Sequence, residues 1–566
     1  MTEIESPRIA DTNETTGATL EEAADPFIWL KSFESRVGRP LRVLHIGNIA
    51  NNAYLNARYL NENGIDCDVL CQDYYHIMGC PEWEEADLVG DPGNQFRPDW
   101  TRVELNGYER PRWFAQGPTR LAIDYLCARR SGQAHRAQRL WEILGVVNGT
   151  RPKAGPTARG VSSYRLRALI QRLVLAATTR EKVQRHLRRL LGGPARPTAL
   201  TRALVTAGGH AADSLMAITQ LFRQERHDDR RLADSLIRRF RDRFPKRADA
   251  LTREDVYPYL LFRRAWSTLF QHYDIVQAYA VDPIYALVGG ARVRCAFEHG
   301  TLRDFTQADN PLHRMTALAY RESGHVFITN GDCREYAERL GVQRFTPMIH
   351  PIQIPDVCAD GFDEQLRQSL NTEIVLFCPL RHDWEAKGTD VHLRAMPAIL
   401  KAVSRRTVLV LTEWGQDLNR SRDLVEKLGI GHAVAWQKPM SRQALMRWMK
   451  ACDVVLDQMT LPHFGATAPQ ALAAGTPVVM SFRSESTAWI VREPPPIIPA
   501  FDEAGVAEAV IRSLEPGFRH EYRRRAIDWV TTHHHPSRLV RDHLHAYRQL
   551  LDAVPGPMTA TEAHVR

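Results

Sequence analysis

Short apolar runs alternate with amphipathic stretches near the start of the chain. The run LRVLHI at 41–46 is followed by a helix-like stretch to about Asn63, which Gly64 closes, and then by the run IDCDVLC at 65–71. Continuous apolar runs bounded by turns are typical of strands buried on both faces, and strand, helix and strand together span about 30 residues. This pattern predicts the first unit of a parallel sheet covered by helices.

Further apolar runs predict that two such sheets follow one another along the chain. The other runs of the first sheet lie at 274–281, 293–300, 324–330 and 346–355. The runs of the second sheet lie at 374–380, 407–412, 432–436, 453–457 and 476–480, before closing helices at about 518–551. The predicted fold class is α/β, with two Rossmann-like domains facing a cleft, and ligands of such folds bind at the carboxyl ends of the strands.

A helical, arginine-rich stretch interrupts the first sheet. Residues 120–264 contain 31 Lys/Arg and 12 Asp/Glu, a local excess of +19, whereas the rest of the chain is at −11 and the whole chain at +8. This asymmetry predicts a large helical insertion with a surface of its own. A solvated or intersubunit face and an anionic membrane surface are both open alternatives. The segment shows no zinc, helix-turn-helix or aromatic-basic signature, so we expect no nucleic-acid partner.

These patterns divide the chain into five parts. We expect a disordered acidic tail (1–26), a first Rossmann-like domain (27–355) with the basic insertion at 116–268, a second Rossmann-like domain (356–516), closing helices (517–552) and a disordered tail (553–566). The apolar runs are shorter than the ~18 residues that a membrane-spanning helix needs, and the first residues do not show the pattern of a secretion signal. The nine cysteines are scattered along the chain, which is typical of thiols in a reducing compartment. These features predict a cytoplasmic location, with the inner face of the membrane as a peripheral alternative.

The stretch HFGATAPQALAAGTPVV at 463–479 carries the most specific pattern. Gly465 allows a tight turn, Thr467 is expected to cap a helix, and Gly475 is expected to end that helix before a strand. Free amides at Gly465, Ala466 and Thr467 would form an anion site strengthened by the helix dipole. On local sequence alone, a strand–helix connection without a ligand fits at least as well.

A second stretch, CPLRHDWEAKGTDVHLRAM at 378–396, places two cations on one predicted loop. Arg381 and Lys387 lie six residues apart. Two fixed cations can clamp a diphosphate and stabilise the charge that develops when it leaves. Alone, the segment also fits a solvated basic loop, but together with the 463–479 stretch it favours the phosphate clamp.

These two stretches resemble the retaining GT-B glycosyltransferases of family four. Arg381 and Lys387 fall on cationic positions of the family, and Pro462 and Gln470 stand where the family has two glutamates. The resemblance covers about 41–115 and 270–550, and it implies an acceptor domain followed by a nucleotide-sugar-binding domain. The matching positions of the later stretch are Phe464, Gly465, Ala471, Ala473, Ala474, Gly475, Pro477, Val478 and Val479.

The resemblance also implies donor-binding roles for single residues. Gln470 would hold the ribose hydroxyls through its amide oxygen, and His463 would partly replace the missing first glutamate near the donor sugar. Gln437 would contact the base. Gly47 and Asn48 occupy the first-strand loop, which in the family contacts donor phosphate or acceptor.

The function that the resemblance implies is sugar transfer, with retention, from a UDP- or GDP-type sugar to a carbohydrate, lipid-linked or small-molecule acceptor hydroxyl in glycan or glycoconjugate biosynthesis. His299, at the end of a predicted strand, would face the transferred sugar and act with Arg381 and Lys387 as a catalytic residue. No metal or cofactor is expected, because these cations would neutralise the diphosphate. The alternatives are a non-catalytic sugar-nucleotide-binding scaffold, which the missing acidic pair favours, and a sugar-nucleotide epimerase or hydrolase.

Two further groups of residues are expected to play no part in metal binding. The Asp66-Cys67-Asp68 sequence lies inside a predicted strand and not in a loop that could hold a metal diphosphate. The three consecutive histidines at 533–535 are expected to lie in an exposed linker between the closing helices.

Overall fold

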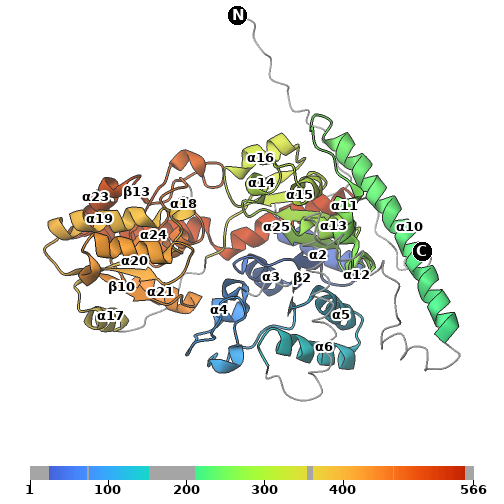
Figure 1. Cartoon of the computed structure of the whole chain (residues 1–566), viewed down its shortest axis with the longest axis horizontal. Helices are drawn as coiled ribbons and strands as arrows, with labels where there is room; N and C mark the ends of the chain where they lie inside the picture. The colour runs from blue at the N-terminus through green and yellow to red at the C-terminus, as the bar shows by residue number, and fades with distance from the viewer. Residues whose placement is uncertain (1–24, 73–75, 152–210, 353–360, 463, 555–566) are drawn as a thin grey trace, which may run out of the picture.

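Two parallel sheets form the centres of two domains that lie side by side (Figure 1). The computed structural model describes residues 25–72, 76–151, 211–352, 361–462 and 464–554. The first sheet has the strand order β3-β2-β1-β4-β5-β6-β7, and the second has the order β10-β9-β8-β11-β12-β13. The apolar runs predicted an α/β fold with two Rossmann-like domains, and this fold class is confirmed.

Each predicted apolar run overlaps a strand, and the structure adds two short strands, β3 and β13, that the runs did not predict. In the first sheet they are β1 (Arg42–Ile46), β2 (Asp66–Cys71), β3 (Phe114–Gln116), β4 (Ile275–Tyr279), β5 (Arg294–Phe297), β6 (His325–Ile328) and β7 (Phe345–Pro347). In the second sheet they are β8 (Ile374–Cys378), β9 (Thr407–Thr412), β10 (Val434–Gln437), β11 (Val454–Leu456), β12 (Val478–Met480) and β13 (Ile498–Pro499). All residues of β4, β8 and β9 are buried, as strands covered on both faces require.

Helices cover both sheets. Those of the first domain and its insertion are α2 (Pro26–Val37), α3 (Asn52–Glu62), α4 (Pro81–Glu85), α5 (Thr119–Arg130), α6 (Ala134–Val147), α10 (Ala211–Arg243), α11 (Arg253–Val256), α12 (Arg263–Phe270), α13 (Pro283–Val288), α14 (Thr301–Asp304), α15 (Pro311–Arg321) and α16 (Cys333–Leu340). Those of the second domain are α17 (Phe362–Leu370), α18 (Trp384–Lys387), α19 (Thr389–Ala402), α20 (Leu418–Lys427), α21 (Arg442–Ala451), α22 (Thr467–Ala473), α23 (Glu503–Ser513) and α24 (Phe518–His533).

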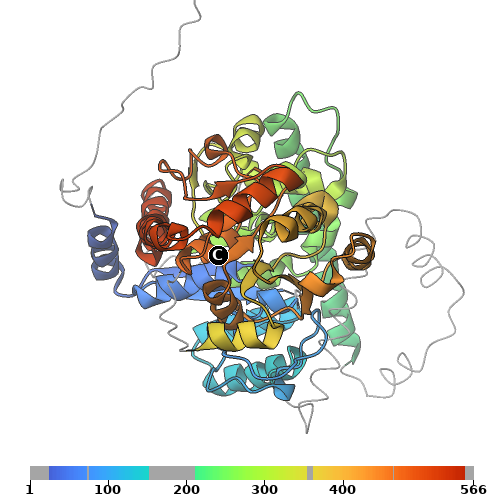
Figure 2. The same ribbon diagram turned by 90° about the vertical axis from the view of Figure 1, so that its left-hand side faces the viewer.

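The last helix, α25 (Pro536–Asp552), returns from the second domain to the first. Its side chains Leu544 and Tyr547 are fully buried in the core of the first domain, and the Tyr547 hydroxyl donates a hydrogen bond of 2.8 Å to Gln277 Oε1 in β4. Figure 2 shows α25 beside α2, with which it is in contact, on the same flank of the molecule. The two domains are therefore joined by α25 as well as by the chain near residue 350.

The basic insertion begins later in the structure than the predicted boundary at 116. That boundary falls on the last residue of β3, and α5 directly after it packs against β2 and β3 as a sheet-covering helix. The long helix α10 lies on the outer flank of the first domain (Figure 1). Two acids of α10 pair with arginines of the following helices: Asp234 with Arg253 of α11 at 2.6 Å, and Asp229 with Arg263 of α12 at 2.9 Å. The insertion's residues 152–210 lie outside the described part of the chain.

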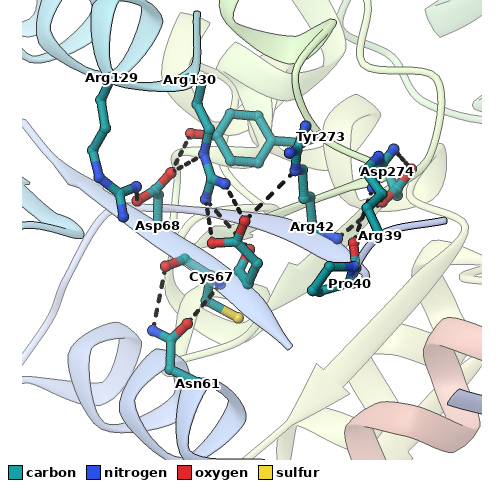
Figure 3. Close-up of polar contacts among 11 residues, drawn as sticks. Arg39, Pro40, Arg42, Asn61, Cys67, Asp68, Arg129, Arg130, Tyr273 and Asp274 are labelled. Carbon is teal, nitrogen blue, oxygen red and sulfur yellow. Dashed lines mark hydrogen bonds and ion pairs between the residues drawn. The ribbon is translucent and has the colours of Figure 1, made fainter. Parts of the chain in front are cut away.

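A buried ion network ties α5 to the amino ends of the strands (Figure 3). The carboxylate of Asp68, in β2, is fully buried and interacts with Arg129 and Arg130 from the last turn of α5. It also accepts a hydrogen bond of 2.7 Å from the Tyr273 hydroxyl. The neighbouring Asp66 binds Arg130 as well, with Nη2 2.9 Å from Oδ1. Asp66 and Asp68 therefore lie in a strand, as predicted, and their carboxylates are bound by arginines at the edge of the sheet opposite the strand carboxyl ends.

Candidate functional site

Two loops meet at the carboxyl ends of the second sheet, where ligands of such folds bind. The loop after β8 carries Arg381 and leads into α18, whose last residue is Lys387. Lys387 Nζ donates a hydrogen bond of 2.7 Å to Gln458 Oε1 in the loop after β11. The backbone carbonyl oxygen of Lys387 accepts a second hydrogen bond, of 2.8 Å, from the Met459 amide. The strand order of the second sheet changes direction between β8 and β11, so these loops flank its switch point.

The two cations of this site differ in their surroundings. The Arg381 side chain is 46% exposed and lies 3.0 Å from Asp383, at the N-cap of α18. Lys387 is largely enclosed, and burial lowers its pKa from the usual 10.5, while the nearby charge of Asp457 raises it and that of Arg381 lowers it further. The structure therefore brings Arg381 and Lys387 within electrostatic reach of each other, one open to solvent and one enclosed.

A buried carboxylate lies beneath Lys387. Asp457 follows β11 and is 2% exposed; its Oδ1 accepts a hydrogen bond of 2.8 Å from the Gln458 amide, and its Oδ2 has no hydrogen-bond partner among the described residues. Burial raises the pKa of Asp457, and the charge of Lys387 and the amides of Gln458 and Ala468 oppose that rise. The sequence pattern did not identify Asp457, because it ends an apolar run that gives no sign of a buried acid.

The helix N-terminus predicted from the 463–479 stretch is α22, but its cap differs from the prediction. Thr467 is the first helical residue, and Ala466 occupies the N-cap position without a side-chain hydrogen bond, so the prediction that Thr467 caps the helix is wrong. Gly465 is exposed, with no heavy atom near the position of a Cβ. Gln470 is 3% exposed within α22. His463 lies outside the described residues.

On the first domain, Gly47 and Asn48 form a tightly bonded loop after β1. Gly47 has φ 88°, and a Cβ there would clash with the carboxylate of Asp282. Asn48 Nδ2 donates to Asn51 Oδ1 at 3.1 Å and to the Gly79 carbonyl at 2.9 Å, and its Oδ1 accepts from the Tyr54 amide at 3.0 Å. The side chain of Asn48 is thus used inside the fold, where it fixes the loop.

His299 stands at the end of β5 as predicted, next to Gly300 in a left-handed conformation. Its ring lies near those of Phe297 (centroids 5.2 Å apart) and His350 (6.5 Å), and its buried Nε2 has no hydrogen-bond partner in the part of the chain that the structure describes. Burial lowers the pKa of His299 to about 3. The imidazole of His299 is therefore neutral at physiological pH.

Asp282 is a carboxyl group that the sequence reasoning missed. It follows β4, at the point where the first sheet changes direction between β1 and β4, and its Oδ1 accepts a hydrogen bond of 3.1 Å from Gln72. Burial raises its pKa to about 7. Strand order is needed to see that the loops after β1 and β4 are neighbours, so the sequence offered no signal for this residue.

A small pocket lies between the domains, beside the chain crossing. Its lining includes Asn330 and His350 from the first domain, Phe464 and Thr487 from the second, and His534 from the junction of α24 and α25. His534 is 2% exposed, with its Nδ1 2.7 Å from the His350 carbonyl oxygen. The expectation that residues 533–535 lie in an exposed linker is therefore wrong for His534, because α25 folds back and encloses this junction.

Gln437 is the last residue of β10, and its carbonyl oxygen accepts a hydrogen bond of 2.7 Å from the Glu413 amide. It thus lies at the same carboxyl edge as Arg381 and Lys387. Among the residues that the structure describes, no three His, Cys, Asp or Glu side chains are grouped so that they could hold a metal ion. Nor does that part of the chain contain a helix with the length and apolar character needed to cross a bilayer.

Fold and site define a class of protein: two Rossmann-like domains facing each other, with a cationic loop beside a helix N-terminus at the carboxyl edge of the second sheet. Residues 362–528 match the family model of the glycosyl transferases group 1. The match covers the second domain and extends into α24.

Two curated relatives are similar to part of the chain. An uncharacterized glycosyltransferase of Methanocaldococcus jannaschii is 36% identical over 95 residues, which are 17% of this chain and 24% of the relative. The D-inositol 3-phosphate glycosyltransferase of Acidothermus cellulolyticus is 31% identical over 151 residues, 25% of this chain and 34% of the relative. The chain thus matches about a quarter to a third of the length of these relatives. Among solved structures, the sucrose-phosphate synthase of Thermosynechococcus elongatus aligns with a TM-score of 0.40 and 16% identity over 52% of this chain and 80% of that one.

Proposed function

We propose that the protein is a glycosyltransferase that moves a sugar from a nucleoside-diphosphate sugar to an acceptor hydroxyl with retention of configuration. The observation that carries the proposal is the hydrogen bond between Lys387 and Gln458, which joins the loop of Arg381 and Lys387 to the loop that leads toward α22, within the region that matches the glycosyl transferases group 1 model. Cations next to amides that lack a side-chain cap suit a diphosphate leaving group.

In this proposal each group has a defined task. Lys387 and Arg381 bind the diphosphate and stabilise the negative charge that grows on it. The bond between the sugar C1 and the leaving phosphate oxygen breaks, the acceptor oxygen bonds to C1 on the same face, and the acceptor proton passes to the leaving phosphate. The neutral His299 offers a hydrogen bond to the sugar, and the amide oxygen of Gln470 accepts from the ribose.

Acceptor and location belong to the same proposal. The acceptor is a carbohydrate, a lipid-linked sugar or a small molecule that meets the first domain near Asp282 at its switch point. A cytoplasmic protein that touches the inner membrane face through its basic insertion fits the charge of 120–264. Sedimentation with liposomes that contain or lack anionic lipid tests this contact, and equal sedimentation in both removes it.

The proposal is tested by substituting Arg381 with alanine. We expect turnover with the preferred nucleotide sugar to fall about 100- to 1,000-fold. Lys401→Ala, an exposed cation on α19, is the matched control and should leave turnover unchanged. The donor is first identified by thermal shifts with a panel of UDP- and GDP-sugars. Full turnover by a folded Arg381→Ala variant would refute the assignment.

The product assay also separates the alternatives. Sugar released into water or epimerised without an acceptor would indicate the hydrolase or epimerase. Donor binding with no turnover against any acceptor extract would favour the non-catalytic scaffold. This alternative is considered because Pro462 and Gln470 stand where the family has two glutamates.

A further inference from the structure

The connection between β2 and β3 forms an acidic segment between the two domains. We call residues 76–104 the strap. It contains a 3₁₀ turn at Ile77–Gly79, α4 and a second 3₁₀ turn at Trp100–Arg102, and its two arms pair at Val89 and Glu104. Ile77, Cys80 and Trp100 are buried together in a small core of its own. The strap is therefore an ordered element and not an extended loop.

One side of the strap is fixed to the first domain. Asn51 Nδ2 donates hydrogen bonds of 3.0 Å to the carbonyl oxygens of Met78 and Cys80, so the loop after β1 holds the start of the strap. Arg110 binds both carboxylate oxygens of Glu82, at 2.8 and 2.7 Å, and the two side chains are only 4% and 1% exposed. A two-point charged contact with so little exposure makes the strap a rigid part of the first domain.

The other side of the strap faces the second domain. In the ion pairs between them, the strap contributes only carboxylates. Three pairs link the two: Glu84 with Arg442 at 3.0 Å, Asp87 with Arg447 at 2.6 Å, and Asp91 with Lys438 at 3.1 Å. In each pair the acid belongs to the strap and the cation to the second domain. Helix α4 lies against α21, which carries two of the three cations (Figure 1).

The three pairs differ in solvent exposure. The Glu84 and Arg442 side chains are 12% and 21% exposed, whereas those of Asp91 and Lys438 are 58% and 76% exposed. Exposed ion pairs contribute little and are screened by salt, and less exposed pairs are screened less. The Glu84–Arg442 pair is thus the anchor of this contact.

The strap meets the second domain at the carboxyl ends of β9 and β10. Lys438 directly follows Gln437, the residue proposed to contact the base, and the ring of Trp414 after β9 lies 6.3 Å from that of His76. We propose that the strap is an ionic latch that holds the first domain closed over the base side of the donor site, with Arg442 as the positioning residue on the second domain.

Charge pairing suits a contact that must open and close. When charged groups separate, water replaces each partner, so opening costs little compared with exposing an apolar interface. An ionic latch also predicts that salt favours the open arrangement, because the screening length falls from about 10 Å at 0.1 M to about 3 Å at 1 M.

The latch is tested by reversing its anchor charge. In Arg442→Glu we expect a larger radius of gyration by small-angle X-ray scattering without nucleotide, and a roughly tenfold weaker affinity for UDP, or for GDP if the donor panel selects it. In the wild type, 1 M salt should also raise the radius of gyration, and in the variant it should add little. The affinity arm rests on the proposed function, whereas the scattering arm does not.

A charge swap separates the latch from a general loss of structure. Glu84→Arg added to Arg442→Glu should restore both the radius of gyration and the affinity, and Lys427→Glu on the outer face of α20 should change neither. The more exposed swap of Asp87 and Arg447 repeats the test if Arg442→Glu fails to fold. An unchanged radius of gyration in folded Arg442→Glu, or no rescue by the swap, overturns the proposal.

Discussion

Replacing Lys387 by alanine is the most direct perturbation of the proposed diphosphate site. The ammonium group contacts Gln458 through its side chain, but the link between the two loops also runs through the Lys387 carbonyl and the Met459 amide, which the substitution preserves. We therefore expect a folded variant that lacks only the charge. Loss of one group that stabilises the charge developing in the transition state costs about 2.7–4 kcal/mol, or about 100- to 1,000-fold in turnover.

The pH dependence gives a sharper form of this prediction. If the ammonium form of Lys387 binds the diphosphate, as proposed, donor affinity should fall as the pH rises through the pKa of Lys387. Burial places that pKa below the usual 10.5, and the charge of Asp457 partly restores it. Asp457→Asn should therefore move the alkaline loss of affinity to lower pH. Lys387→Arg should remove this loss altogether, because a guanidinium group stays charged.

Combining the two substitutions tests whether Asp457 acts through Lys387. In a Lys387→Arg background, Asp457→Asn should leave the alkaline side of the affinity profile unchanged. Donor affinity is measured by calorimetry at a series of pH values, with Lys401→Ala as the control for loss of a distant cation. Turnover that survives in Lys387→Ala, or an equal shift by Asp457→Asn in both backgrounds, would refute the reasoning.

Three further predictions concern stability. Asp68→Asn should cost about 3–5 kcal/mol in the local stability of β2, measured by hydrogen exchange, since it removes the buried charge that Arg129 and Arg130 share. Asp390→Asn, at an exposed pair, should cost under about 1 kcal/mol. Burial lowers the pKa of His534 to about 3, below the unfolded value of 6.5, so folding stability should be full above pH 6.5 and fall by about 1.4 kcal/mol per pH unit below it. His534→Gln should remove that part of the slope in urea titrations. Gly47→Ala should lower the melting temperature through a clash with the carboxylate of Asp282, and Asp282→Ala in the same chain should recover part of the loss.

The sheets were predictable because most of their strands are buried on both faces, although the edge strands β7 and β10 are only partly buried. All six residues of β9 are buried and the four central ones are Val or Leu, so a run of apolar residues marks this strand in the sequence. The same holds for the strand–helix–strand order, since a parallel connection needs a crossover helix. Strand order is different, because it depends on which side of the sheet each crossover takes, and periodicity carries no record of that choice.

The residues of the candidate site were predictable only where they lie close together in the sequence. Arg381 and Lys387 lie six residues apart, and a local pattern is enough to pair them. The contacts that fix the site are not local. Glu84 and Arg442 are 358 positions apart in sequence, and each belongs to a charged helix that could equally face solvent. The same applies to His534, which is buried only because α25 returns to the first domain.

The replacement of the family glutamates by Pro462 and Gln470 bears on how the proposed donor is recognised. The nearby carboxylate of Asp457 does not substitute for the first glutamate, because it is 2% exposed and ends a strand beneath Lys387. Its charge reaches the donor only through that lysine. In the proposed site, recognition of the sugar would rest on neutral groups, the backbone at Gly465 and the imidazole of His299, whose pKa burial lowers to about 3. Donor affinity should therefore vary little between pH 5 and pH 8, and a steep loss of affinity toward pH 5 would show that an acidic group near the sugar takes part in recognition.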